Sequence, residues 1–232
     1  MSEEKYVVRA DTDFKAEQQK TEETPVMSAN FILRGMYVTM DLLYGAAPTL
    51  PKFKVIELLA RPPYWAWERG GYVRVTRLYS RRPQFSDPEE AKLALRHIDL
   101  GRDSQDNEQW HLRIIHDIME KQGIKQDFVR GILLPRLMVL SYILLAEIIY
   151  RLNPAWSFSM NARFESHAEH EYMKLVQAHP EWEEQPIDCE LVAPESETLT
   201  LADLFRQIGL DERHHKQESI DEYERLTGRP LV

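Results

Sequence analysis

The stretch NARFESHAEHEYMKLV, residues 161–176, carries six titratable side chains within eight positions. It contains neither proline nor glycine, so its composition favours a helix. At 100° per residue, Tyr172 falls on the same helix face as Glu165, two turns away, with Glu169 between them. His167 and His170 fall on roughly the opposite face, so we expect them to point outward. The two histidines could also bind zinc, but we find no further ligands for that side of the helix.

The composition of the chain favours one all-helical domain. Its 232 residues suffice for one large or two small domains, 43% are hydrophobic and only 9 are glycine. Cys189 is the single cysteine, which excludes disulfide frameworks and cysteine-rich metal sites, so a metal would need Glu, Asp and His ligands. The net charge of -9 argues against a nucleic-acid partner. We expect residues 1–27, which are polar and carry no signal peptide, to be a mobile arm before a domain spanning 28–232.

Prolines and loop residues divide the domain into six predicted helical blocks. Pro62 and Pro63 are expected to kink the second block, and Ser86 is expected to cap the third, with Pro88 in its first turn. The role of the acidic loop at 181–198 stays open. The blocks cover about residues 28–45, 52–79, 86–122, 127–152, 154–179 and 198–227.

The fourth block is apolar on nearly every face between Gly131 and Tyr150. Its length approaches that of a membrane span, although Pro135, Arg136 and Glu147 argue against a simple span. Two interpretations remain open, a core helix of a bundle and a helix lying in the membrane surface. The first block has a similar apolar character, and the two blocks together could instead form a dimer interface.

Two predicted helices carry the pattern Glu-x-x-His, which directs a carboxylate and an imidazole toward one point. Glu108 and His111 form one pair, and Glu212 and His215 form the other. Each pair shares its helix face with apolar residues, so both pairs should face inward. One such pair arises easily by chance, and the sixth block offers a rotated alternative in Asp211 with His214.

Lone glutamates on two other helices would complete a metal site. Glu165 is one, and Glu57, within an apolar run, is the other, with Glu68 as its competitor. Four carboxylates with two histidines form the ligand set of ferritin-like di-iron bundles, and this set suits two iron ions. Beside such a centre Tyr172 could pass an electron and a proton, although core packing is the usual role of a tyrosine at this spacing.

The segments IELLARPPY, NEQWHL, FESHAEHEY and LDERHH together resemble the alternative oxidases, above all their plastid terminal oxidase branch. The likeness comprises four motifs in the family's order and covers roughly residues 28–225. It implies a membrane-bound di-iron quinol oxidase that reduces O2 to water without pumping protons. The implied fold is a ferritin-like four-helix bundle with two additional membrane-facing helices, usually a homodimer on one leaflet.

The resemblance assigns roles residue by residue. It implies that Tyr172 is the catalytic tyrosine, and that Asn107 and Asp211 orient the ligand imidazoles. Two positions depart from the family and bear on the quinol contacts: Glu171 stands where Thr is usual, and Lys52 where the mitochondrial branch has Arg. The implied iron ligands are Glu57, Glu108, His111, Glu165, Glu212 and His215.

The sequence therefore predicts a quinol oxidase on one membrane face, reached by quinol between the first and fourth blocks near Lys52, Glu57 and Glu171. The membrane would be bacterial or thylakoid, with the protein on its cytoplasmic face. The quinol could be plastoquinol or ubiquinol. Three alternatives remain: a soluble di-iron oxygenase or oxidase, an iron-storing bundle, and a membrane-surface scaffold without metal.

Overall fold

The computed structural model describes residues 5–80, 88–196 and 198–231. Within these ranges the chain forms seven α-helices and no β-strands, apart from two isolated bridges at Tyr6–Val192 and Pro186–Thr200. The helices are α1 (Phe14–Glu23), α2 (Phe31–Tyr44), α3 (Leu50–Tyr79), α4 (Pro88–Lys121), α5 (Leu134–Leu152), α6 (Pro154–Ala178) and α7 (Leu201–Thr227).

Local sequence signals account for where these helices begin and end. A capping box between Thr200 and Asp203 starts α7, and Gly228, with a positive φ of 66°, ends it. The Asn153 side chain accepts a hydrogen bond from the Ala155 amide and starts α6. Pro62 and Pro63 do not interrupt α3, which runs through both as one helix. The predicted cap at Ser86 lies outside the described residues.

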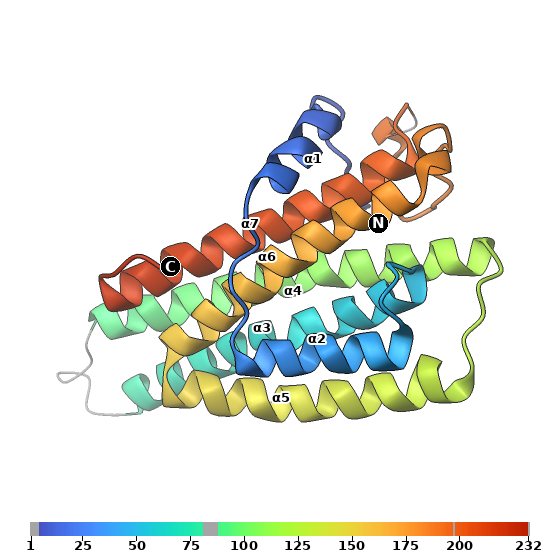
Figure 1. Ribbon diagram of the computed structural model, residues 1–232. Coiled ribbons are helices and arrows are strands. Elements are labelled where there is room, and N and C mark those ends of the chain that lie inside the picture. Colours follow the sequence, from blue (N-terminus) through green and yellow to red (C-terminus); the bar gives the residue numbers. More distant parts are fainter. Residues whose placement is uncertain (1–4, 81–87, 197, 232) are drawn as a thin grey trace.

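The helices form a bundle in which α3 packs along α4 and α6 packs along α7 (Figure 1). Helices α2 and α5 lie along one face of the bundle, at the bottom of this view. The largest hydrophobic core lies among α3, α4, α6 and α7 and contains Ile114, Ile115, Tyr172 and Phe205. A second core joins α2 and α5 to α3 and α6 through Leu33, Leu59 and Tyr142, among others.

The fourth predicted block starts with a π-helical turn, Val129–Leu133, that continues into α5. Within the described residues, the stretch Val129–Leu152 is long and apolar enough to cross a membrane. Only 22% of its most apolar 18-residue segment is buried. The side chains of Leu140, Leu144 and Leu152 are at least 64% exposed. Bundle packing therefore leaves most of this apolar helix uncovered.

The segment expected to be a mobile arm carries helix α1, which packs on α6 and α7. The Tyr6 amide donates to the Leu191 carbonyl, and the Ala193 amide donates to the Tyr6 carbonyl. The side chains of Thr21 and Phe14 are almost fully buried. Specific long-range contacts thus place a polar segment whose composition alone suggested mobility.

Candidate metal centre

Four helices bring the six predicted iron ligands into one buried cluster. Helix α3 supplies Glu57, α6 supplies Glu165, and α4 and α7 each supply a glutamate and a histidine one turn apart. The clustered residues are Glu57, Glu108, His111, Glu165, Glu212 and His215, and none is more than 4% exposed. Glu68 and His214, the competing choices, are not part of it.

The cluster consists of two overlapping groups of potential metal ligands. One group combines Glu57 and His111 with Glu108 and Glu212, and the other combines Glu165 and His215 with the same two glutamates. The candidate ligand atoms within each group lie within 4.8 Å of one another. Nδ1 of His111 is 3.3 Å from Oε1 of Glu212, and Nδ1 of His215 is 3.1 Å from Oε1 of Glu108. Two glutamates are thus placed to be shared between two ions.

Several buried atoms of this cluster have no hydrogen-bond partner among the described residues. They are Oε2 of Glu57, both carboxylate oxygens of Glu108, Nδ1 of His111 and Oε2 of Glu165. Buried polar atoms are almost always satisfied in folded proteins. A metal ion bound by these oxygen and nitrogen atoms would satisfy them, so the residues present fit such a centre.

The four buried carboxylates repel one another and require positive charge nearby. Burial raises the pKa of Glu57 well above its usual range, and repulsion from Glu108 raises it further. Burial and the charge of Glu212 act in the same way on the pKa of Glu165. Burial would lower the pKa of His111, but the hydrogen bond to Asp211 and the attraction of the neighbouring glutamates raise it overall. Without a metal, protons supply the charge that cations would provide.

Two tyrosines bond to the cluster in a reciprocal way. The Tyr172 hydroxyl, on α6, donates a hydrogen bond to Oε1 of Glu57 on α3. The Tyr64 hydroxyl, on α3, donates to Oε1 of Glu165 on α6 at 2.7 Å. On both helices the tyrosine follows the glutamate by seven residues. Helices α3 and α6 therefore make equivalent contributions, as do α4 and α7 with their Glu-x-x-His pairs.

Tyr64 was not among the predicted site residues, although its spacing from Glu57 repeats that of Tyr172 from Glu165. The repeated spacing was the signal that could have identified it. Asn161 was also missed as a participant; its amide donates to the Tyr64 hydroxyl at 3.2 Å and to Ser219 at 3.1 Å. The first hydrogen bond holds the Tyr64 hydroxyl beside Glu165, and the second holds the Asn161 amide in place.

Asp211 supports the cluster from outside. Its Oδ2 lies 3.2 Å from Nε2 of His111, which leaves Nδ1 directed at the glutamates. The same oxygen accepts a hydrogen bond from the Tyr6 hydroxyl at 2.5 Å. Asn107, the other predicted orienting residue, reaches Asp211 at 3.4 Å and contacts no imidazole directly in the described hydrogen bonds. Tyr6 was not selected from sequence, because no local pattern links it to residue 211.

The predicted quinol contacts line a separate pocket of about 290 Å³ between α2, α3 and α6. In this pocket Lys52 Nζ bonds to Asp41 at 2.7 Å, and Glu171 bonds to Lys174 at 2.7 Å. Glu57 does not line it, but its neighbour Ile56 does. An apolar cleft of about 360 Å³ lies between α2, α3 and α5 and shares Met36 and Leu59 with the pocket. The predicted approach between the first and fourth blocks corresponds to this second cleft.

The histidines of α6 face away from the cluster but are covered, contrary to the expectation that they point outward. Both ring nitrogens of His170 bond to backbone carbonyls, those of Ser166 and Thr24. The His167 ring stacks on Tyr37 at 4.0 Å between centroids. These contacts come from Thr24, directly after α1, and from Tyr37 on α2. The sequence of α6 alone does not show that either segment packs against it.

No family model, curated protein or solved structure matches this chain. What the geometry establishes is an all-helical protein with buried carboxylate and histidine groups that could hold a di-metal centre.

Proposed function

We propose that the cluster holds two iron ions and that the protein is a membrane-associated quinol oxidase. Glu57 and His111 would bind one ion, Glu165 and His215 the other, and Glu108 and Glu212 both. Carboxylate-rich sites with two imidazoles suit iron, which exchanges electrons with O2 when bound in this way. The overall reaction is the oxidation of two quinols to two quinones and the reduction of one O2 to two waters.

One observation carries the choice of a quinol as the donor. A partly polar pocket is lined by Ile56 and Glu171, the sequence neighbours of Glu57 and Tyr172. It continues into an apolar cleft between α2 and α5 through the shared residues Met36 and Leu59. A quinol has a polar, hydrogen-bonding ring and an apolar tail. The ring would contact Lys52 and Glu171 in the pocket, and the tail would follow the apolar cleft.

The chain's own residues would handle the protons of this reaction. Glu171 is 7% exposed and accepts from Lys174, so its carboxylate is placed to accept a proton from a quinol hydroxyl. The next residue, Tyr172, donates a hydrogen bond to Glu57 on α3. Its hydroxyl can give up a proton to Glu57 as the ring gives up an electron.

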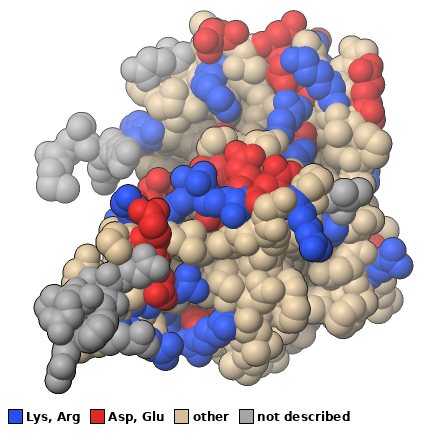
Figure 2. Space-filling model, turned by 90° about the vertical axis from the view of Figure 1, so that its left-hand side faces the viewer, with Lys and Arg blue, Asp and Glu red and all other residues tan. Residues whose placement is uncertain are grey.

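A membrane surface as the source of quinol is supported by α2 and α5. The side chains of Phe31 and Leu42 on α2 are 84% and 79% exposed, and α5 adds a row of exposed leucines. Exposed apolar patches of this kind mark interaction sites. On the end of the molecule in Figure 2, charged side chains of both signs gather over the upper and middle parts, while the lowest part that is not grey is mainly uncharged with a few Lys and Arg. We propose that this lower face lies in one leaflet.

Oxygen uptake tests the proposal. The iron-loaded protein in detergent receives a short-chain quinol, with and without cyanide. We expect cyanide-resistant uptake that falls to background in Glu212→Ala, which also loses iron, and in Tyr172→Phe, which retains it. Glu218→Ala, on the same helix but paired with His214 outside the cluster, should leave uptake unchanged. No uptake from wild-type protein that holds two irons would contradict the quinol assignment and favour a soluble substrate.

A further inference from the structure

The Tyr172 ring is the inner end of a column of stacked aromatic rings. Tyr172 and Phe205 lie 6.4 Å apart between centroids, with 21° between their planes. Phe205 and Trp182 are 4.8 Å apart at 21°, and Trp182 and His179 are 4.2 Å apart at 9°. All three pairs are close to parallel. The column therefore passes from the buried cluster through α6 and α7 to the short helix Pro180–Glu183.

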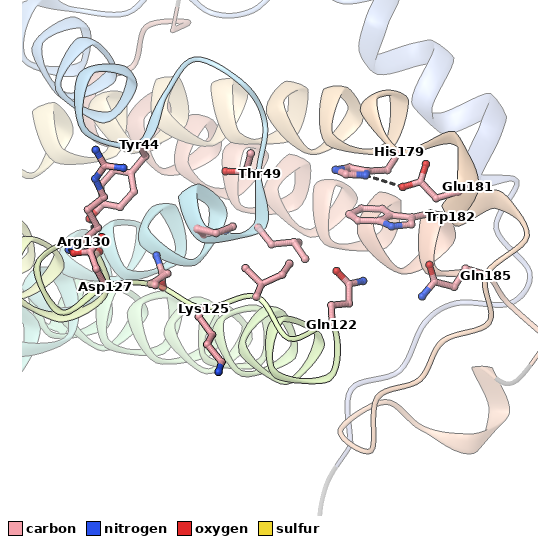
Figure 3. Close-up of a pocket in the computed structure, with 14 residues that line it drawn as sticks. Tyr44, Thr49, Gln122, Lys125, Asp127, Arg130, His179, Glu181, Trp182 and Gln185 are labelled. Carbon is pink, nitrogen blue, oxygen red and sulfur yellow. Dashed lines mark hydrogen bonds and ion pairs between the residues drawn. The ribbon is translucent and has the colours of Figure 1, made fainter.

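The outer end of the column opens on a cleft of about 730 Å³. His179 and Trp182 line one end of this cleft, and Tyr44 and Arg130 line the other (Figure 3). The amide side chains of Gln122 and Gln185 also line it, and neither forms a hydrogen bond within the described residues. The cleft shares no lining residue with the pocket that contains Lys52 and Glu171. It has the size of a small-molecule site and offers polar groups beside an aromatic wall.

The reciprocal tyrosine has no comparable outlet. Tyr64 meets Trp67 edge to face, at 5.0 Å and 82°. Trp67 then contacts Phe158, which contacts His97. These three side chains are buried and line none of the cavities described above, whereas Trp182, although only 3% exposed, lines the cleft. The two tyrosines thus occupy equivalent places at the cluster but differ in what lies behind them.

We propose that the column connects Tyr172 electronically to the surface, with Trp182 as its redox partner. Phenol and indole are the two side chains of the column that lose one electron most readily, and the ring of Phe205 bridges them. Tyr172 would be oxidised during O2 reduction when the quinol has supplied too few electrons to complete it. The inference rests on the proposed function only for this source of the oxidised tyrosine. The column would then discharge an oxidised Tyr172 before it damages the core.

One electron and one proton move in each step of this discharge. The Tyr172 phenoxyl radical takes one electron from Trp182 and recovers the proton held by Glu57, which restores the tyrosine. Trp182 loses its indole proton to water in the cleft and becomes a neutral radical. A donor of the ascorbate or phenol class, bound in the cleft, returns one electron and one proton to Trp182. The donor leaves as its own one-electron-oxidised radical.

Pulse radiolysis of the full-length, metal-free protein tests the connection without any enzyme activity. Azide radicals oxidise tryptophan, and the absorption bands of tryptophan and tyrosine radicals are then followed in time. We expect a first-order phase, independent of protein concentration, in which a tryptophan radical decays as a tyrosine radical appears. This phase is the exchange between Trp182 and Tyr172 followed in the reverse direction, and it requires the same column of rings. Trp182→Phe and Tyr172→Phe should each remove this phase, and Phe205→Leu should slow it at least tenfold.

Trp156→Phe is the matched control, because Trp156 is 59% exposed and belongs to none of the described ring pairs. It should leave the phase unchanged. Circular dichroism and thermal unfolding of each variant confirm that it folds. The proposal is overturned if the phase is missing from wild-type protein, if it survives in Trp182→Phe, or if Phe205→Leu does not slow it. None of these results bears on the quinol oxidase assignment, which the oxygen-uptake experiment tests.

Discussion

Asp211 is the residue through which several separate parts of the chain act on the cluster. Its carboxylate contacts His111 on α4, Tyr6 near the N-terminus and Gln207 on α7. Burial opposes ionisation of Asp211, but the hydrogen bond to His111 and the charge of that ring hold the pKa of the carboxyl below its usual range. An ionised Asp211 fixes the His111 ring with Nδ1 toward the glutamates. Outer partners of this kind make a large contribution to metal affinity.

The first prediction concerns this contact. Asp211→Asn keeps the size of the side chain but removes its charge, so His111 is oriented less firmly. We expect affinity for Fe(II) or Co(II) to fall about 10- to 100-fold, measured by equilibrium dialysis under anaerobic conditions. Asp221→Asn is the control, because Asp221 lies on the same helix and bonds only to Gln217 in the described contacts. Equal affinities for Asp211→Asn and wild type would rule out an orienting role.

Helices α3 and α4 approach each other closely at Gly101. A Cβ atom at this position would lie 2.6 Å from the Tyr64 carbonyl oxygen and 3.0 Å from the Glu68 amide nitrogen, both on α3. These are backbone atoms of a long helix and cannot move alone. The close approach fixes the separation of the helices that carry Glu57 and Glu108. By contrast, a Cβ atom on Gly35 of α2 would meet nothing within 4 Å.

The second prediction follows from this contrast. Gly101→Ala should lower the free energy of unfolding by about 1–3 kcal/mol through overpacking, and it should weaken metal binding by separating α3 from α4. Gly35→Ala should be neutral or stabilise by about 0.5–1 kcal/mol, because alanine favours a helix over glycine. Urea denaturation of both variants measures the difference. Equal unfolding midpoints for the two variants would show that the approach at Gly101 is not tight.

The helices and the six clustered residues could be predicted because both depend on local periodicity. Glu-x-x-His places two side chains on one face wherever a helix forms, and apolar neighbours show which face is buried. The covering of His170 and the order of α1 could not be predicted, because both depend on contacts between residues about 150 or more positions apart, such as Thr21 with Glu169. The single block predicted over residues 52–79 was also correct, because α3 contains Pro62 and Pro63 without a break.

On the scale of the whole molecule, Glu169 joins the N-terminal segment to the bundle. Its carboxylate bonds to Arg213 at 2.8 Å, to Lys216 at 2.6 Å and to Thr21 at 2.8 Å. Burial raises the pKa of Glu169, but the hydrogen bonds to Lys216 and Arg213 lower it below its ordinary value of 4.5 overall. Because its pKa is lower in the folded state, Glu169 stabilises the fold at pH values above its ordinary pKa. That stability is lost as pH falls through the folded pKa.

The third prediction is a pH-dependent effect of Glu169→Gln. At about pH 7 the variant should be less stable than wild type by about 1–3 kcal/mol. The difference should shrink as pH falls through the folded pKa of Glu169, which lies below its ordinary value of 4.5, because the wild-type side chain then becomes protonated as well. Urea unfolding over a series of pH values measures it. Glu184→Gln, at an exposed position, controls for the loss of one charge. A difference that stays constant with pH would mean that the ion pairs of Glu169 do not stabilise the fold.

The central claim is that four helices bring six side chains together to hold two metal ions. Crystals grown with iron and measured at wavelengths on both sides of its absorption edge test this claim most directly, because anomalous scattering both counts and locates the ions. We predict two anomalous peaks per chain, one beside Glu57 and His111 and the other beside Glu165 and His215, with Glu108 and Glu212 between them. A single peak, peaks elsewhere, or no peak from protein saturated with iron would contradict the account.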